Sequence, residues 1–191
     1  MKKNSLVFYI LLLFSSCKTA EFGGSTMDVN GMMYDFENRP ISGYEINIGS
    51  KYSSVSDITG RFTIQKVPIG TYEVRGKRLN YESYQGELVL KDKKQIVYIR
   101  VPSATQLLDL ADKALVENNV KEAANYVERA DKTGMRSTES LFYAAVILFR
   151  RNDYKGAIYI LEQLIVSGTN DAYVVQFLND LKKICGVEDV N

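Results

Sequence analysis

The chain contains no histidine and no tryptophan, and only three prolines and two cysteines among its 191 residues. Without histidine it cannot build a Ser-His-Asp or Cys-His catalytic centre, a zinc site that relies on imidazole, or a histidine-ligated haem. The serines stand in turn sequences without a nucleophile elbow, and no pair of carboxylates has a recognisable catalytic arrangement. We therefore expect no catalytic residue, no cofactor and no metal, and a protein that is not an enzyme.

An excess of charge of one sign is also lacking. Lys and Arg number 24, Asp and Glu number 23, and the formal net charge is +1. The sequence has no long basic run and no motif that reads DNA or RNA. Because binding to nucleic acid depends on neutralising its phosphates, we expect no nucleic-acid partner.

The N-terminus is a short basic and apolar leader. Two lysines precede the unbroken apolar run Leu6–Phe14. A bilayer-spanning helix needs about 20 apolar residues, so this run has the length of a signal-peptide core and not of an anchor. Two serines, which are small residues, stand directly before Cys17. We predict a signal peptide over residues 1–16.

The sequence that ends at Cys17 resembles the lipobox of bacterial lipoproteins, in which the cysteine is lipidated and becomes the mature N-terminus. The resemblance implies lipidation of Cys17, a lipid anchor and tether over residues 17–26, and a membrane partner reached through the lipid. It also implies a bacterial cell envelope, with an outer membrane favoured and the protein facing the periplasm or the cell surface. The alternative is an ordinary signal peptide with a chance cysteine near its cleavage site. If Cys17 is acylated, Cys185 has no cysteine partner, so no intramolecular disulfide can form.

Residues 27–101 have the two-residue periodicity of β-strands. The alternating segments are Tyr44–Ile48, Phe62–Ile64, Tyr72–Val74, Leu88–Leu90 and Ile96–Val101. Turn residues separate them, at Asn38–Pro40, Asp57–Gly60 and Pro68–Gly70. Short strands with such turns between them predict a sandwich of two antiparallel sheets.

The motifs of this region resemble the carboxypeptidase regulatory-like domain. They are Val29-x-Gly31, Pro40-Ile41-x-Gly43, Asp57-x-x-Gly60-x-Phe62-x-Ile64 and Val67-Pro68-x-Gly70-x-Tyr72. The resemblance implies a seven-stranded, prealbumin-like (transthyretin-like) antiparallel β-sandwich that is a non-catalytic accessory module. In physical terms, we expect Asp57 to close an Asx-type turn and Gly60 to adopt a positive φ. Phe62 and Tyr72 should then point into the space between the sheets.

Two sets of side chains in this region could bind a ligand. Asp57 could ligate calcium together with Ser54, Ser56 and Thr59. Tyr81, Tyr84 and Tyr98 could stack on sugar rings, which makes a glycan a possible partner. A structural role is favoured for both sets, because calcium needs a full ring of oxygens and tyrosine is common as a half-buried strand residue.

The periodicity becomes helical after Pro102, with Ser103 as the candidate N-cap. Residues 34 positions apart then correspond to one another. The pairs are Leu107 with Leu141, Leu110 with Ala144, Ala111 with Ala145, Ala123 with Ala157, and Val127 with Leu161. This period resembles the tetratricopeptide repeat, which implies pairs of antiparallel helices. We expect an all-α, tetratricopeptide-like domain over residues 103–185 and a tail at 186–191.

Two repeats leave an open end, and Asp171–Cys185 has the amphipathic pattern of a helix that caps it. In tetratricopeptide arrays the first helix of each repeat lines a concave surface that binds peptides. We therefore expect a partner-binding surface there, with the candidate residues Leu108, Leu115, Phe142, Val146 and Phe149. The alternative is that the capping helix or the sandwich of the same chain covers these apolar residues.

Taken together, these patterns predict a multidomain β + α protein without an active site. The favoured function is a membrane-anchored adaptor or scaffold that binds other proteins of the cell envelope. The alternative is an envelope lipoprotein that binds glycan or peptidoglycan through its sandwich.

Overall fold

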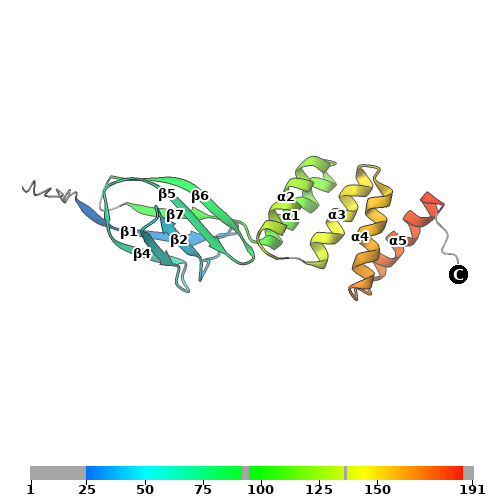
Figure 1. Cartoon of the computed structure of the whole chain (residues 1–191), viewed down its shortest axis with the longest axis horizontal. Coiled ribbons are helices and arrows are strands. Elements are labelled where there is room, and N and C mark those ends of the chain that lie inside the picture. Colours follow the sequence, from blue (N-terminus) through cyan, green and yellow to red (C-terminus); the bar gives the residue numbers. More distant parts are fainter. Residues whose placement is uncertain (1–24, 92–94, 136, 187–191) are drawn as a thin grey trace, which may run out of the picture.

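The described chain is elongated, with seven strands at one end and five helices at the other (Figure 1). The computed structural model describes residues 25–91, 95–135 and 137–186. The predicted signal peptide, Cys17, most of the tether and residues 187–191 of the predicted tail lie outside the described residues. Among the helices of the described residues, none is long and apolar enough to cross a membrane.

The strands form two sheets that face each other. The three-stranded sheet has the order β4 (Arg61–Pro68), β1 (Thr26–Tyr34), β7 (Ile96–Arg100), and the four-stranded sheet has the order β3 (Tyr52–Val55), β2 (Glu45–Ile48), β5 (Gly70–Arg78), β6 (Tyr81–Leu90). Buried and exposed residues alternate along β1, and the residues of β2 alternate in the same way. A sheet that packs one face on a core requires this alternation.

The predicted fold class is wrong in one respect, because the sandwich is not wholly antiparallel. β7 runs parallel to β1, from Asn30 opposite Ile96 to Tyr34 opposite Arg100. The chain crosses from the four-stranded to the three-stranded sheet between β6 and β7, and this crossover sets the direction of β7. Parallel and antiparallel pairs share the same two-residue alternation, so the sequence pattern carries no information about direction. A mixed sandwich therefore replaces the antiparallel, prealbumin-like one.

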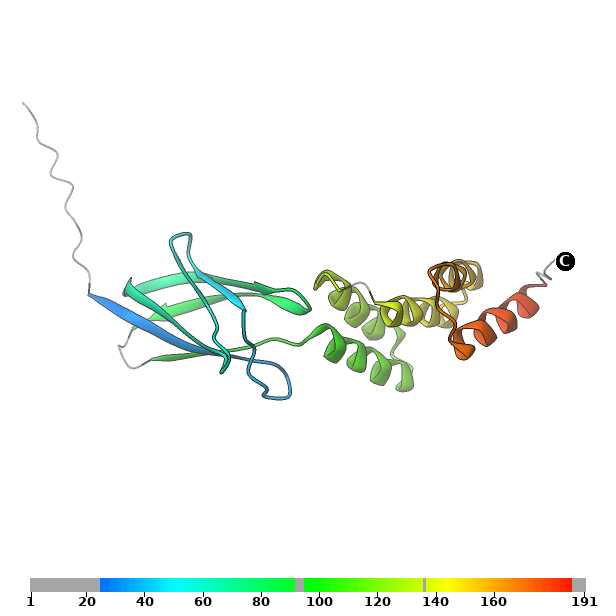
Figure 2. The same cartoon turned by 90° about the horizontal axis from the view of Figure 1, so that it is seen from below.

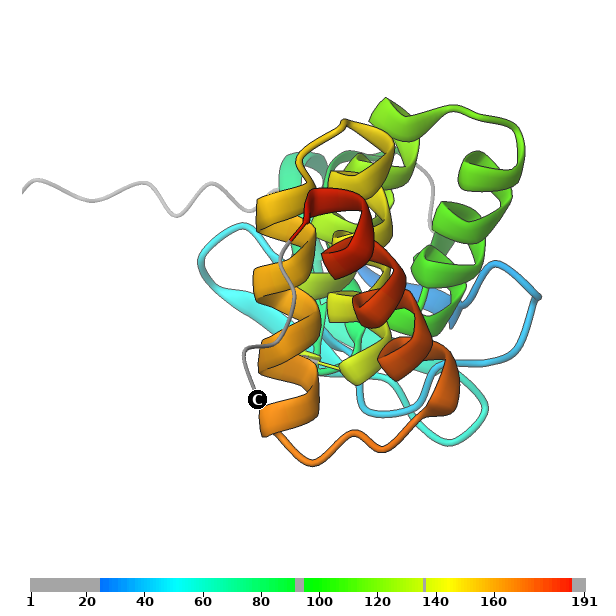
Figure 3. The same ribbon diagram turned by 90° about the vertical axis from the view of Figure 1, so that its right-hand side faces the viewer.

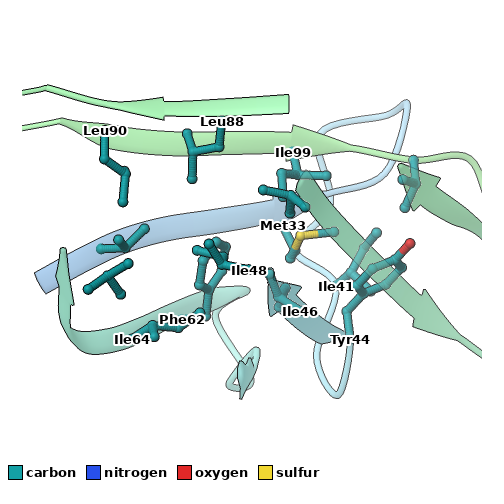
Figure 4. Packing of buried hydrophobic residues seen from close by; sticks show 14 of the residues in the cluster. Met33, Ile41, Tyr44, Ile46, Ile48, Phe62, Ile64, Leu88, Leu90 and Ile99 are labelled. Carbon is teal, nitrogen blue, oxygen red and sulfur yellow. The ribbon is translucent and has the colours of Figure 1, made fainter. Parts of the chain in front are cut away.

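Side chains from both sheets fill the space between them (Figure 4). Phe62 lies against the backbone of β1, since a Cβ atom on Gly31 would sit 2.2 Å from its ring. Phe62 is 3% exposed, and burial of such a side chain contributes about 1.5–3 kcal/mol. Tyr72 is half-buried against the same core, and its hydroxyl donates to the Pro68 carbonyl at 2.8 Å. The predicted inward orientation of Phe62 and Tyr72 is confirmed.

The turn between β3 and β4 is held by the Asp57 carboxylate. One oxygen accepts the backbone N–H groups of Thr59 (2.8 Å) and Arg61 (3.0 Å), and the Gly60 N–H donates to the Asp57 carbonyl (2.9 Å). The hydrogen bond from the Thr59 hydroxyl, followed by the backbone bond from Arg61, lowers the pKa of Asp57. Gly60 has a φ of +76°, and a Cβ atom there would lie 2.5 Å from the Met33 carbonyl oxygen. The predicted Asx turn and the positive φ are confirmed.

A second turn of the same construction follows β1. The Asp35 carboxylate accepts the backbone N–H groups of Glu37 (2.8 Å) and Arg39 (2.9 Å), and Asn38 here has the positive φ, 61°. Burial raises the pKa of Asp35, but the hydrogen bonds from the Arg39 side chain and from the backbone outweigh burial, so the pKa is lowered overall. The spacing Asp-x-x-Asn-Arg repeats the Asp-x-x-Gly-Arg of residues 57–61, a correspondence that the sequence analysis missed.

The C-terminal half consists of α1 (Ala104–Val116), α2 (Val120–Lys132), α3 (Thr138–Arg150), α4 (Tyr154–Val166) and α5 (Ala172–Cys185). α1 packs with α2, α3 packs with α4, and α5 lies beside α4 at the end of the molecule (Figure 3). Each helix begins after a polar N-cap whose side chain accepts a backbone N–H; these residues are Ser103, Asn119, Ser137, Asp153 and Asp171. The predicted cap at Ser103 is confirmed, and with Gln106 it forms a capping box.

The 34-residue correspondence reappears in the packing of the two helix pairs. Ala111 and Ala145 are both completely buried, so small residues stand at corresponding places in α1 and α3. Asn118 and Asn152, in the turns that follow these helices, have φ values of 60° and 62°. Asparagine tolerates this left-handed conformation better than most residues do. The same local chemistry therefore builds both helical hairpins.

The tip of the β5–β6 hairpin joins the two halves of the molecule (Figure 2). Asn80 donates its N–H to the Thr133 carbonyl at the end of α2 (3.2 Å), and its carbonyl accepts the N–H of Ala104 at the start of α1 (2.9 Å). Arg129 of α2 forms a two-pronged ion pair with Glu82 of β6, with N–O distances of 2.7 and 2.9 Å. The hairpin tip is thus clamped between α1 and α2, which restricts the motion of one half relative to the other.

We expect Gly60→Ala to lower the free energy of unfolding by about 2–4 kcal/mol. The left-handed conformation costs a side chain about 1–2 kcal/mol, and the new methyl group would overlap the Met33 carbonyl. The measurement is urea unfolding followed by circular dichroism. Gly70→Ala is the matched control, because its Cβ would make an ordinary contact 3.6 Å from Tyr72. Native-like stability of Gly60→Ala would contradict this account of the turn.

For the joint, we expect a double-mutant cycle of Arg129→Met and Glu82→Gln to give a coupling free energy of about 0.5–1.5 kcal/mol. The two side chains are 30% and 28% exposed, so solvent screens the pair only in part. Lys132 and Glu128 form the control pair on the same helix, with side chains 71% and 65% exposed and an expected coupling below about 0.5 kcal/mol. A joint coupling no larger than the control coupling would show that the ion pair does not hold the halves together.

Candidate functional site

A pocket of about 490 Å³ opens between α3, the α4–α5 loop and α5; we call it the α3–α5 pocket. Its walls are Thr138, Glu139 and Phe142 from α3, Thr169 and Asp171 from the loop, and Tyr173 and Val174 from α5. Clefts that bind ligands in proteins usually measure about 300–1,000 Å³. The α3–α5 pocket is therefore large enough to take one bulky side chain of a partner.

Aromatic contacts between α3 and α5 hold the two helices together next to the pocket. The Phe142 ring lies edge-on to the Phe177 ring with centroids 6.3 Å apart, and Phe149 lies edge-on to the same ring at 5.5 Å. Aromatic pairs of this kind contribute about 0.5–1.5 kcal/mol each beyond the burial of area. Val174 is 5% exposed in the same cluster. α5 cannot shift without breaking these contacts, so its wall of the pocket is preorganised.

Hydrogen bonds at two helix N-termini fix the rim. Asp171 accepts the N–H of Tyr173 at 2.8 Å, and Ser137 accepts the N–H of Ser140 at 3.0 Å. The Tyr173 side chain itself is 83% exposed. An aromatic residue with that exposure beside an apolar pocket is typical of a contact surface and not of a core.

Tyr143 of α3 lies close to carboxylates of both α1 and α3. Burial, followed by the charges of Asp112, Glu139 and Asp109, raises the pKa of Tyr143 to about 12. A raised pKa means that the neutral phenol contributes stability that is fully present below about pH 10 and is lost as the pH rises toward 12. At neutral pH the phenol of Tyr143, between the two helices, is therefore uncharged.

The structure places the five candidate partner-binding residues in different surroundings. Phe142 lines the α3–α5 pocket, and Phe149 packs beneath it on Phe177. Leu108 and Leu115 are 1% and 6% exposed in the core of α1, α2 and α3, and Val146 packs against that core. The prediction of one exposed stripe is wrong for Leu108 and Leu115, because neighbouring helices cover them. Binding of a partner by Phe142 stays a prediction.

The sequence analysis missed Thr169 and Tyr173 as walls of the pocket. Both become neighbours of Phe142 only when the α4–α5 loop and the first turn of α5 fold back toward α3, which no local pattern specifies. One signal was available in the sequence. Tyr173 stands outside the buried stripe of α5, which consists of Val174, Leu178 and Leu181, so the sequence places an aromatic residue off the packing face of the helix.

The four residues that could ligate calcium are not assembled into a metal site. Asp57 is engaged in its own turn, and the Ser56 hydroxyl donates to the Ile41 carbonyl (2.6 Å) while accepting the Tyr44 N–H (2.9 Å). Within residues 25–91, 95–135 and 137–186, no group of three or more His, Cys, Asp or Glu residues could hold an ion. Asp57 and Ser56 therefore have structural roles.

The three tyrosines considered for glycan binding do not share a face. Tyr81 and Tyr84 of β6 pack against the core between the sheets. Tyr98 of β7 is 66% exposed on the outer side of the other sheet, since its neighbour Ile99 points inward with 3% exposure. These three tyrosines therefore do not form one glycan-binding face, and Tyr81 and Tyr84 have the structural role that the sequence favoured.

No family model matches the sequence, and no curated protein matches it either. Among solved structures, the chain is similar to a C-terminal interface mutant of a type II cohesin–X-dockerin complex from Acetivibrio cellulolyticus, with 24% identity over 41% of this chain and 58% of that chain, and a TM-score of 0.36. The corresponding N-terminal interface mutant gives 26% identity over 39% of this chain and 51% of that chain, and a TM-score of 0.30. The chain thus spans less than two thirds of the length of either match. Neither of these proteins is described as prealbumin-like or as a tetratricopeptide protein, and at these TM-scores the likeness carries no argument about function.

Proposed function

We propose that this protein is a non-catalytic scaffold that binds a partner protein through the α3–α5 pocket while a lipid on Cys17 holds it at a membrane of a bacterial cell envelope. The observation that carries the proposal is the pocket, in which an apolar floor lies beside a tyrosine that is 83% exposed. Tyrosine side chains that a partner buries at the centre of a contact supply much of the binding energy of protein interfaces.

Two further features support a binding role. Histidine is absent from the whole chain, which removes the commonest general base and metal ligand. The clamp of the β5–β6 hairpin between α1 and α2 restricts how the pocket can turn relative to the sandwich. A restricted orientation suits a protein whose task is to position a partner, because less freedom is lost on binding.

We expect Tyr173→Ser to reduce partner binding at least about tenfold, since truncation of an interface tyrosine commonly costs more than 1–2 kcal/mol. The measurement is photo-cross-linking of the full chain in its native envelope through a photoreactive residue at position 169, with the cross-linked partner quantified by mass spectrometry. Tyr159→Ser is the matched control, because this tyrosine of α4 is 63% exposed and does not line the pocket. Equal yields from the two variants would contradict binding through the pocket.

For the anchor, we expect Cys17→Ser to abolish incorporation of a fatty-acid analogue and to release the protein from the membrane fraction. Stable membrane attachment through lipid requires about two acyl chains, which a lipoprotein cysteine carries. The measurement is metabolic labelling followed by fractionation of cells. Cys185→Ser is the matched control and should leave both results unchanged. Labelling that persists in the Cys17→Ser variant would contradict the anchor.

A further inference from the structure

We infer that the segment bound by the α3–α5 pocket is cationic: one large apolar side chain enters the pocket, and lysine or arginine residues flank it. This inference rests on the proposed function and specifies the chemistry of the partner.

The walls of the pocket combine an apolar interior with acidic side chains. Phe142, Val174 and the ring of Tyr173 can surround an apolar group, while among the described wall residues the charged ones are Glu139 and Asp171. Both carboxylates belong to exposed residues, so they face solvent beside the apolar floor. A bound segment therefore meets negative charge wherever it leaves the apolar part of the pocket.

The acidic surface continues from the pocket across α1. The charges of Asp109 and Asp112 reach Tyr143 together with that of Glu139, which places carboxylates of α1 and α3 around one side chain. Asp171, the N-cap of α5, lines the α3–α5 pocket together with Glu139, so four exposed carboxylates lie on α1, on α3 and at the start of α5.

Among the described acidic residues of the helical half, three are paired with a lysine, whereas these four are not. Glu128, Glu162 and Asp180 each form an ion pair with a lysine of the chain, at 2.6, 3.2 and 3.9 Å. Within the part of the chain that the structure describes, Asp109, Asp112, Glu139 and Asp171 form no ion pair with lysine or arginine, although Lys113 and Glu37 line a small pocket together with Asp109. Like charges that form no ion pair repel one another, and a cationic partner relieves that repulsion.

Charge complementarity of this kind speeds association and makes it sensitive to salt, while the apolar anchor supplies most of the affinity. An acidic segment with the same anchor would be repelled by the rim. The two contributions can therefore be separated by changing the anchor and the flanking charges independently.

The test uses the full-length protein and three fluorescent peptides of equal length, with binding followed by fluorescence anisotropy. The first carries a central Phe flanked by Lys and Arg, the second carries the same Phe flanked by Glu, and the third carries Ser flanked by Lys and Arg. We expect the first peptide to bind at least about tenfold more tightly than either of the others, and to lose about tenfold when salt rises from about 0.05 to 0.5 M.

The double variant Glu139→Gln, Asp171→Asn should weaken binding of the first peptide about three- to tenfold, because two exposed charges are removed from the rim. Asparagine at position 171 keeps the N-cap, since it accepts the same backbone hydrogen bond. Asp180→Asn is the matched control, an exposed carboxylate of α5 that does not line the pocket, and it should leave the affinity unchanged.

The outcomes distinguish this inference from the proposed function. The inference of a cationic segment is wrong if the Glu-flanked peptide binds as tightly as the basic one, or if the double variant binds the basic peptide normally. Binding through the pocket is still supported in that case if Tyr173→Ser abolishes peptide binding.

Self-association of the protein that Tyr173→Ser abolishes would also contradict the cationic segment, because a second copy of the chain would then occupy the pocket. If cross-linking and peptide binding are both independent of Tyr173, the proposed function falls as well.

Discussion

The clamp on the β5–β6 hairpin is the contact on which the rest of the architecture depends. Asn80 donates its N–H to a carbonyl at the end of α2, and its own carbonyl accepts an N–H at the start of α1. One residue of the sandwich is therefore hydrogen-bonded to both helices. The neighbouring ion pair of Arg129 and Glu82 acts between the same two elements, α2 and β6. Further contacts support the same joint, because the Phe36 N–H donates to the side-chain oxygen of Gln106 in α1 at 3.4 Å and Tyr81 forms a β-bridge with Ser103.

Local chemistry made much of the fold predictable from the sequence. The Asp57 turn, the positive φ of Gly60 and the cap at Ser103 each depend on residues within four positions of one another, and each was found where it was expected. The direction of β7 depends on where the chain crosses between sheets, and alternation cannot report it. Periodicity identifies elements and their faces, whereas the direction in which a strand enters a sheet is a property of the whole chain.

The site was predictable only at Phe142. A second apolar stripe on α3 was visible in the sequence, but which of its members would be covered depends on how neighbouring helices and α5 pack against it. Leu108 and Leu115 are buried in the helical core, and the Phe149 ring packs against the Phe177 ring. Tyr173 lines the pocket although it stands outside the buried stripe of α5, because the α4–α5 loop brings the start of α5 close to α3. Tertiary packing, and not local preference, selects such residues.

The elongated outline of the molecule has a mechanical consequence. β1 begins near one end and α5 lies at the other, with the hairpin clamp between them (Figure 1). If the proposed lipid holds the end at β1, a small tilt of the sandwich carries the distant pocket through a wide arc, in the manner of a lever arm, because the hairpin clamp joins the two halves. The length of the folded chain would then set the distance from the membrane at which a partner is met.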